Sequence, residues 1–351
     1  MVKKNIAIIA PLGISIPPKK QGGNEWMVFY IIEGLVKRGH KVLVFGPKTT
    51  KTSAKLVPII EKPISAYKIP ETAEGTRKLR LELTLLAKTK NELLKKKKEI
   101  GIVINFTVDG GIFAPLEKEM KVPVLHCLHL PLYEELAMLY KEFNSRLIAL
   151  SSNEKKAFAH LNYVATIYNG IDFKRFPFQK KPKDYFLFSG KIRATKNPLA
   201  AIKAIKKTKQ KLIIIGKIND KEYFDKKIKP ALGKNIIYKG EVTFDEAIKL
   251  YSQAKALLFP IKWQEPFGLV MPESMACGTP VIAFNNGAAS EVIKNGKTGF
   301  IVKNTGEMAK AIKKIDQIKR EDCRKWVEKK FTKEKMVDEY EKILKKTLKK
   351  N

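Results

Sequence analysis

Short apolar runs alternate along the chain with longer stretches in which apolar residues recur every three to four positions. The apolar run Asn5–Ala10 is followed by a helical stretch from about Asn24 to Arg38, and then by a second run at Lys41–Phe45. A strand, a helix and a strand in this order are typical of a βαβ unit in a parallel sheet. Further strand-length runs follow in the first half: Gly101–Phe106, Val122–Leu128, Arg146–Ala149 and Val164–Tyr168. The pattern predicts an α/β fold.

The alternation stops once and then restarts, which predicts two domains, as does the length of 351 residues. Residues 169–183 begin with an Asn-Gly turn and continue rich in Pro and Lys, as a linker would. We expect a Rossmann-like domain over 1–168, a second over 184–332, and a C-terminal helix over 333–351 that crosses back to the first. The second half contains these apolar runs: Tyr185–Ser189, Lys211–Ile215, Ile236–Lys239, Ala256–Phe259, Pro280–Phe284 and Gly299–Val302.

Three stretches of the first half are less regular. Lys51–Pro70 has scattered Pro and Lys and no clear period, so it is a candidate for an acceptor-side loop, which the sequence does not decide. Ser151 and Ser152 are expected to cap a helix at Glu154–His160. Arg77–Lys98 reads as a basic amphipathic helix, which would either pack on the sheet or lie on an anionic membrane. Its apolar side is expected to consist of Leu79, Leu83, Leu86, Leu93 and Leu94.

The composition is strongly basic, with 69 Lys and Arg against 35 Asp and Glu and a formal charge of +34. This charge favours polyanions or anionic membranes as neighbours, although a solubility bias without a specific partner explains it equally well. Only eight of the basic residues are Arg, the residue best suited to forked recognition of bases and phosphates. Three cysteines without a Cys-x-x-Cys spacing indicate a reduced protein without structural zinc. No signal peptide or membrane-spanning stretch is recognised, so we expect a cytoplasmic protein, with peripheral contact to the inner membrane left open.

The most informative stretch runs from Trp263 to Phe284 and is predicted to form a loop, a short helix ending at Gly278, and a strand. Glu265 lies in the loop and Glu273 eight residues later on the helix. Between them, the backbone amides of Phe267, Gly268 and Leu269 stand at the helix start, where a positive dipole end favours phosphate or sugar oxygens. Gly268 has no Cβ and allows a ligand close to the main chain. An anion-binding helix end between two carboxylates suits a nucleotide-sugar.

Other candidate residues follow predicted strands, at the edge where parallel sheets bind ligands. Lys191, Arg193 and Lys196 precede a helix that begins near Pro198, where cations would stabilise a diphosphate leaving group. The pair Gly22-Gly23 opens the first long helix, and His129 follows the strand that ends at Leu128. The glycine pair lacks the full Gly-x-Gly-x-x-Gly pattern, which argues against a nicotinamide cofactor.

These motifs resemble those of the retaining glycosyltransferases of family 4, whose two Rossmann-like domains face each other across a cleft in the arrangement called GT-B. The resemblance lies in E-x7-E followed by A-x-G-x-P-V, in the glycine pair, in PVLHCLH, in YNGID and in GKIRATKNP. It implies that Glu265 binds sugar hydroxyls with the Phe267–Leu269 amides, and that Glu273 binds the ribose. It also implies that His129 contacts the transferred sugar. His126 is a poor second, and His40 and His160 have no functional case.

Further parts of the donor site follow from the same resemblance. It implies that Gly22 and Gly23, and less clearly Asn24, lie across the cleft from the donor diphosphate. It also implies that Lys239 to Val242 flank the base through backbone contacts. Asn286, Gly287 and Glu291 match a segment interpreted as mainly structural. The chain departs from the family at two positions: Lys191 stands for an Arg, which Arg193 would have to replace, and Asn197 stands for a Gly.

The sequence therefore predicts a retaining glycosyltransferase that moves a sugar from a nucleoside-diphosphate-sugar to an acceptor hydroxyl. His129, Lys196 and Glu265 are the predicted catalytic residues, and no nucleophile is assigned. Because no Asp-x-Asp is present, we expect lysines and helix ends to replace a metal, with no cofactor beyond the co-substrate. The nucleotide, the sugar and the acceptor stay open, and the acceptor is a lipid-linked molecule, a glycan or a small molecule.

Four alternatives compete with this prediction. A nucleotide-sugar epimerase or a phosphorylase would use a related fold without the E-x7-E string. A nucleic-acid-binding protein would suit the charge, but Arg is scarce and no basic stripe with stacking aromatics is evident. A glycoside hydrolase would use two carboxylates but would not need Lys191 and Lys196 at a helix start.

Overall fold

The computed structural model describes residues 4–18, 22–67, 75–108 and 110–349. The chain forms two compact units. The first unit consists of Met1–Tyr168 together with Lys333–Asn351, and the second consists of Asn169–Thr332. Each unit is built around its own parallel sheet, so the predicted fold class of two Rossmann-like α/β domains is confirmed.

The first unit contains a seven-stranded sheet in the order β3-β2-β1-β4-β5-β6-β7, with every pairing between these strands parallel. Its strands are β1 (Asn5–Ile9), β2 (Val42–Pro47), β3 (Lys55–Ile60), β4 (Ile100–Asn105), β5 (Val124–Cys127), β6 (Arg146–Ala149) and β7 (Tyr163–Thr166). Its helices are α1 (Gly23–Lys37), α2 (Gly75–Lys95), α3 (Leu116–Met120), α4 (Glu134–Glu142) and α12 (Lys333–Lys349). The central strands are almost wholly buried, as expected for strands covered on both faces.

The stretch Lys51–Pro70 is more ordered than its composition indicates. It contains the edge strand β3 and a 3-10 turn at Ile64–Tyr67, while residues 68–70 lie outside the described part of the chain. The sequence left this stretch undecided between a loop and regular structure, and the structure contains a strand and a turn in it. Pro58 lies inside β3, which is tolerated because an edge strand leaves one side of its backbone unpaired.

Two helix predictions also need correction. In α2, Leu85, Leu86 and Leu93 are buried, whereas Leu79 and Leu83, which were assigned to the same apolar side, are 54% and 50% exposed. The predicted helix Glu154–His160 is only a 3-10 turn over Glu154–Lys156. The Ser151 hydroxyl does accept a hydrogen bond from the Glu154 amide at 3.2 Å, so the cap is present without the helix.

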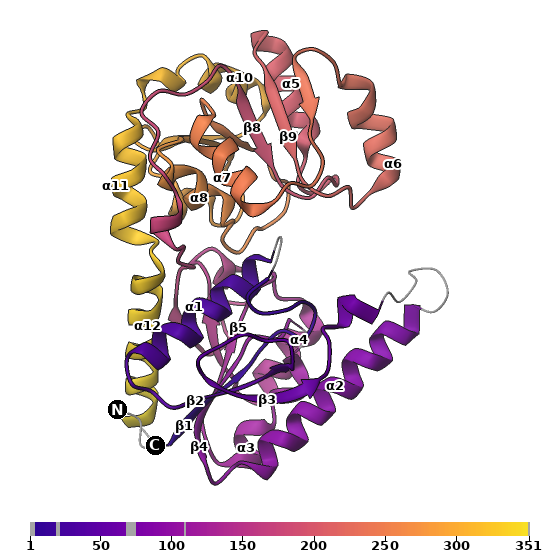
Figure 1. Ribbon diagram of the computed structural model, residues 1–351, viewed down its shortest axis with the longest axis vertical. Helices are drawn as coiled ribbons and strands as arrows, with labels where there is room; N and C mark the ends of the chain where they lie inside the picture. The colour runs from indigo at the N-terminus through magenta and orange to yellow at the C-terminus, as the bar shows by residue number, and fades with distance from the viewer. Residues whose placement is uncertain (1–3, 19–21, 68–74, 109, 350–351) are drawn as a thin grey trace. The chain divides into compact units, whose positions relative to one another are not determined.

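The C-terminal helix α12 lies beside α1 in the first unit (Figure 1). Gly34 of α1 lets the two helices approach, because a Cβ at this position would lie 2.6 Å from Cγ2 of Val337. Polar contacts add to this packing: Arg38 Nη2 lies 2.5 Å from Asp338 Oδ1, and His40 Nε2 lies 3.0 Å from Glu341 Oε1. His40 thus has a structural partner.

The second unit contains a six-stranded parallel sheet in the order β10-β9-β8-β11-β12-β13. Its strands are β8 (Phe186–Ser189), β9 (Leu212–Ile215), β10 (Ile236–Tyr238), β11 (Leu257–Phe259), β12 (Val281–Phe284) and β13 (Gly299–Val302). Its helices are α5 (Pro198–Thr208), α6 (Lys221–Tyr223), α7 (Phe244–Gln253), α8 (Val270–Ala276), α9 (Ala289–Val292), α10 (Thr305–Ile312) and α11 (Arg320–Lys330). The order in which strands are added to the sheet changes direction between β10 and β11, so β8 and β11 are neighbours at the centre of the sheet. Because these two strands are parallel, the loops that follow them leave the same edge of the sheet side by side.

Candidate functional site

The Glu265 carboxylate is the centre of a polar cluster in the second unit, in the loop between β11 and α8. Its Oε2 atom is in direct contact with the Lys196 ammonium and accepts a hydrogen bond of 2.9 Å from Trp263 Nε1. The Lys196 nitrogen also lies 4.9 Å from the centroid of the Trp263 ring. Glu265 and Lys196 come from loops that follow different strands, so the fold brings together two of the three predicted catalytic residues.

The backbone of Glu265 is held by the loop that follows β12. The Glu265 carbonyl accepts a hydrogen bond of 3.0 Å from the Ala288 amide, and the Gln264 side chain accepts one of 3.0 Å from the Gly287 amide. A Cβ at Gly287 would lie 2.2 Å from the Glu265 carbonyl oxygen, so only glycine fits. The segment interpreted as mainly structural is thus a direct support of the site.

The predicted oxygen-binding amides follow Glu265. Gly268 has φ of +81°, and a Cβ there would lie 2.9 Å from Met271 and 3.0 Å from Phe259. Among the described residues, no group accepts a hydrogen bond from the amides of Gly268 or Leu269, which leaves both available to a ligand. Phe267 contributes a buried ring that packs on Phe331 with 5.6 Å between centroids.

Glu273 lies on α8 and is largely enclosed, and this burial raises the pKa of its carboxyl to about 7. The Tyr251 hydroxyl hydrogen-bonds to this carboxyl, and the positive charge of Arg175 also acts to lower its pKa. Tyr251 Oη in turn lies 2.8 Å from the hydroxyl of Ser189, the last residue of β8. The Glu273 carboxyl is therefore oriented by Tyr251 of α7, which is itself held by Ser189 of β8.

The loop between β8 and α5 carries the three predicted cations. Lys191 is exposed, whereas Arg193 donates from Nε to the Thr195 hydroxyl at 2.6 Å and lies 5.9 Å from the Trp263 ring centroid. Asn197, which stands for the family's glycine, has φ of +56° and donates from its side chain to the Pro260 carbonyl at 2.9 Å. Asn is one of the few residues that tolerate this conformation, so the departure at this position keeps the turn.

Val242 lies in the loop after β10, two residues beyond Gly240, whose φ is +77°. The Gly240 carbonyl accepts a hydrogen bond of 2.8 Å from the Gly216 amide, which ties together the loops that follow β10 and β9. No side-chain function is evident for Val242, and its expected place beside a base stays a prediction.

In the first unit, Phe106 contacts both His129 and Asn24, the residue that follows the glycine pair. Asn24, next to the pair, donates from its side chain to the Phe106 carbonyl at 3.5 Å, and the Phe106 ring lies 5.6 Å from that of His129. A Cβ at Gly22 would lie 2.7 Å from Ile14 and Pro18, so this N-cap position of α1 requires glycine. Gly23 is exposed at the start of the helix.

His129 is the histidine whose surroundings fit a ligand. Its Nε2 atom is buried and has no hydrogen-bond partner among the described residues. Burial lowers the pKa of His129 to about 4, so the imidazole is neutral at ordinary pH. His126 is fully enclosed and instead bonds through Nδ1 to the Asn105 side chain at 3.2 Å.

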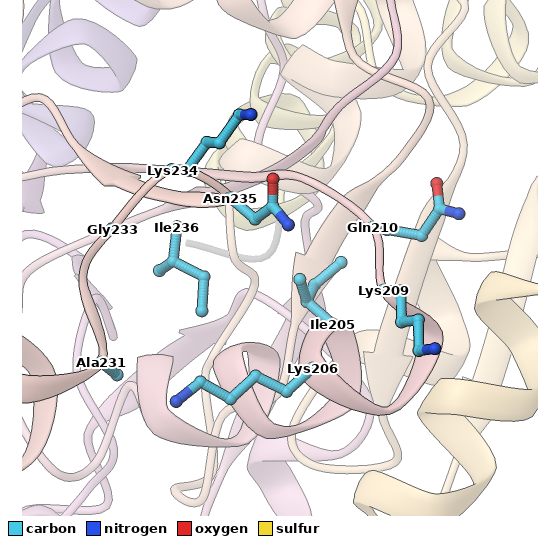
Figure 2. A pocket seen from close by; sticks show the side chains of 9 residues that line it. All are labelled: Ile205, Lys206, Lys209, Gln210, Ala231, Gly233, Lys234, Asn235 and Ile236. Atoms are coloured by element: carbon cyan, nitrogen blue, oxygen red, sulfur yellow. The ribbon is translucent and has the colours of Figure 1, made fainter.

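A cavity of about 370 Å³ lies at the opposite edge of the second sheet, between the end of α5 and the start of β10 (Figure 2). It is lined by Ile205, Lys206, Lys209, Gln210, Ala231, Gly233, Lys234, Asn235 and Ile236. The three lysine side chains extend in different directions in Figure 2, so they do not converge on one ligand position. None of the predicted site residues lines this cavity.

Two family models match the chain, one on each half. Residues 21–175 match Glycosyltransferase Family 4, and residues 171–333 match Glycosyl transferases group 1. The chain belongs to this glycosyltransferase family. The membership rests on both halves, since the two models together span nearly all of the described chain.

The chain is similar to a curated relative in sequence and to solved structures in fold. The "Probable sucrose-phosphate synthase" of Thermosipho melanesiensis is 28% identical over 247 residues, which are 61% of this chain and 56% of that protein. The structure of sucrose-phosphate synthase from Thermosynechococcus elongatus matches with a TM-score of 0.79 at 19% identity, covering 99% of this chain and 100% of that chain. Anabaena HepE in complex with UDP-glucose matches with a TM-score of 0.73 at 17% identity, covering 98% and 100%. The chain spans between 33% and 56% of the length of the curated relatives that it matches first.

The family motifs account for Glu265, Glu273 and Lys196 but not for what holds them. Trp263 stands two residues before Glu265, and the sequence analysis assigned it no role. The sequence analysis also assigned no role to Tyr251, although its hydroxyl hydrogen-bonds to Glu273. The position of an aromatic residue inside a charged motif could have marked Trp263 in the sequence. Its hydrogen bond to Glu265, however, depends on the conformation of the folded loop.

Proposed function

We propose that the protein transfers a sugar from a nucleoside diphosphate to an acceptor hydroxyl. The observation that carries this proposal is the contact between Lys196 and Glu265 beside the amides of Gly268 and Leu269, which donate to no described residue. A cation, a carboxylate and two such amides within one loop cluster match the charges and hydroxyls of a nucleotide-sugar. Family membership supports the same reaction class.

In this reaction the bond between the anomeric carbon and the diphosphate oxygen breaks, and a bond from the acceptor oxygen forms. The acceptor hydroxyl releases its proton to solvent, and the diphosphate leaves with an additional negative charge. Lys196 would stabilise that charge, helped by Arg193 and the exposed Lys191, because preorganised cations favour the charge that develops in the transition state. These residues support our proposal that no metal ion is required.

The two glutamates would divide the recognition of the donor. Glu265 Oε2 is already engaged, and no described residue donates to its other oxygen, so a sugar hydroxyl would bind there. Glu273 would accept hydrogen bonds from the ribose, and Val242 would lie near the base. In the first unit, Gly22, Gly23 and the neutral His129 would contact the diphosphate and the sugar. We propose retention of anomeric configuration, as the family resemblance implies.

A UDP-sugar is the first donor to test, because HepE was crystallised with UDP and with UDP-glucose. The acceptor remains unassigned. An anionic membrane surface is proposed as a partner on the strength of the exposed Leu79 and Leu83 beside Arg77, Lys78 and Arg80. No helix in the described part of the chain has the length and apolar character needed to cross a membrane.

The proposed function is tested by donor binding and by turnover. UDP-, GDP- and ADP-sugars are screened by thermal shift, since a ligand at 100 times its Kd adds about 2.7 kcal/mol to stability. With the donor identified, Glu265→Ala and Lys196→Ala should each abolish transfer while the folding transition is retained. Near-normal turnover in both variants would refute the site, and a strict requirement for added metal after EDTA treatment would refute the metal-independent mechanism.

A further inference from the structure

Trp263 occupies a position in the cluster that none of the family motifs explains. Its indole N–H donates to Glu265 Oε2 at 2.9 Å, and its ring faces two cations, with centroid distances of 4.9 Å to Lys196 Nζ and 5.9 Å to the Arg193 guanidinium carbon. One side chain thus contacts the acid and both cations. Cations over the face of an indole ring are attracted by its electron distribution, so the ring also helps to hold the loop before α5.

Lys196 has two partners in the proposed reaction. Without a ligand it neutralises Glu265, and with a donor it is needed at the diphosphate. A lysine ammonium on a flexible stem can move between the two, but its departure leaves Glu265 without one of its two donors. The Trp263 N–H is then the remaining described contact to Oε2, and it comes from a rigid ring.

The loop geometry makes this contact difficult to replace. The Glu265 amide donates to the Trp263 carbonyl at 3.0 Å, which closes a tight three-residue turn from Trp263 to Glu265. The Lys262 amide, next to Trp263, donates to the Thr195 carbonyl at 2.8 Å and ties the turn to the loop that carries Arg193 and Lys196. The backbone that carries the indole is therefore tied to both loops of the cluster.

We propose that Trp263 is a positioning residue that keeps the Glu265 carboxylate aimed at the sugar after Lys196 turns to the diphosphate. This inference rests on the proposed function and deepens it by assigning a role in recognition of the sugar half of the donor. It predicts that loss of the N–H weakens binding of the sugar nucleotide and leaves binding of the free nucleoside diphosphate unchanged.

Two substitutions separate the N–H from the bulk of the ring. Trp263→Phe keeps a six-membered aromatic ring and removes the donor. Trp263→His places Nε2 the same number of bonds from Cβ as the indole nitrogen, so it restores the donor and loses the second ring. Trp326→Phe is the matched control, because it removes an indole hydrogen bond of 2.8 Å to Val292 elsewhere in the same unit.

Calorimetric titration of the full-length protein with UDP-glucose and with UDP, followed by transfer kinetics, tests the proposal. If another base is preferred in the donor screen, the corresponding pair is used. Trp263→Phe should bind the sugar nucleotide about tenfold more weakly, as expected for a lost hydrogen bond to a charged group, with the Kd for the diphosphate unchanged. Trp263→His should recover much of the loss, and Trp326→Phe should match the wild type in both titrations.

A double-mutant cycle shows whether the effect passes through Glu265. In a Glu265→Gln background, Trp263→Phe should change sugar-nucleotide binding by less than about twofold, because the carboxylate that it orients is absent. The positioning role would be overturned if Trp263→Phe weakened the binding of the sugar nucleotide and of the free diphosphate equally. It would also be overturned if Trp263→Phe bound the sugar nucleotide more tightly than Trp263→His. If the wild type binds no sugar nucleotide at all, the proposed function fails first, and that result is separate.

Discussion

Gly287 packs against the backbone of Glu265 so closely that a side chain is excluded. A Cβ at position 287 would lie 2.2 Å from the Glu265 carbonyl oxygen and 2.4 Å from its amide nitrogen, and Gly287 has φ of +57°. Because both clashes are with backbone atoms, no rotamer change relieves them. The position of the Glu265 loop therefore depends directly on a glycine in the loop after β12.

Replacing this glycine should displace the Glu265 loop. We expect Gly287→Ala to lower the thermal midpoint and to weaken transfer more than tenfold. Gly296→Ala is the control, because Gly296 also has a positive φ, +73°, but a Cβ there meets nothing within 4 Å. That control should lose only the cost of the left-handed backbone, about 1–2 kcal/mol. Equal midpoints in the two variants would contradict the packing argument.

The contact between α1 and α12 predicts that Gly34→Ala changes the stability in the opposite direction from the one expected in an isolated helix. Gly34→Ala should normally stabilise a helix interior by about 1 kcal/mol. Here the new Cβ would lie 2.6 Å from Val337, so the variant should instead be destabilised by about 1–3 kcal/mol. In a Val337→Ala background the same substitution should become stabilising. Thermal unfolding of the four proteins tests this, and an additive result would argue against direct contact.

The raised pKa of Glu273, about 7, predicts a pH-dependent stability difference. Between its ordinary value of 4.5 and about 7, the folded protein holds a proton that the unfolded chain has released, so the contribution of Glu273 to stability falls as pH rises. Glu273→Gln should therefore be more stable than the wild type at pH 8, and the advantage should fade toward pH 5. Thermal midpoints measured across this range provide the test.

A second glutamate supplies a control of opposite sign. Hydrogen bonds from the Thr243 amide and hydroxyl hold the pKa of Glu246 below its usual value. Its contribution to stability is therefore present at neutral pH and is lost on acidification. Glu246→Gln should be less stable than the wild type at pH 7, with the deficit shrinking toward acid pH. If Glu273→Gln and Glu246→Gln both changed stability with pH in the same direction relative to the wild type, the opposite pKa shifts assigned to the two glutamates would be refuted.

The exposed start of α2 predicts binding to anionic membranes. Wild-type protein should sediment with vesicles of phosphatidylcholine and phosphatidylglycerol, but not with phosphatidylcholine alone, and added salt should weaken the binding. Replacing Leu79 and Leu83 with serine should reduce sedimentation, because both side chains are half exposed beside basic residues. Ile237→Ser, at an exposed apolar position of the second unit, serves as the control. Unchanged sedimentation of the leucine variant would remove this surface from consideration.

The fold was predictable because its central strands are nearly continuous apolar runs. Asn5–Ile9 and Ile100–Asn105 are buried along almost their whole length, and such runs are recognisable without knowledge of their neighbours. The edge strand Lys55–Ile60 was missed because only Val57 and Ile59 are buried and a proline interrupts it. On α1, Met27 and Ile31 are buried by covering elements that a periodic pattern in the sequence cannot identify.

The site was predictable only where a residue type itself carries the chemistry. Glu265 and Lys196 were identified by charge and motif, and the fold brings them into contact. The support by Trp263 and Gly287 was not predictable, because an indole N–H direction and a backbone approach arise only when separate loops meet. The roles of His129, Glu273 and Val242 toward a ligand stay predictions.

The first unit is assembled from two separated segments of chain, and this ordering affects how the protein emerges from the ribosome. Residues 333–349 are synthesised after the whole of the second unit, although their helix packs on α1. During translation the side of α1 around Gly34 therefore stays uncovered by α12 while residues 169–332 are made. The packing of the first unit is completed only when the C-terminal helix has been released.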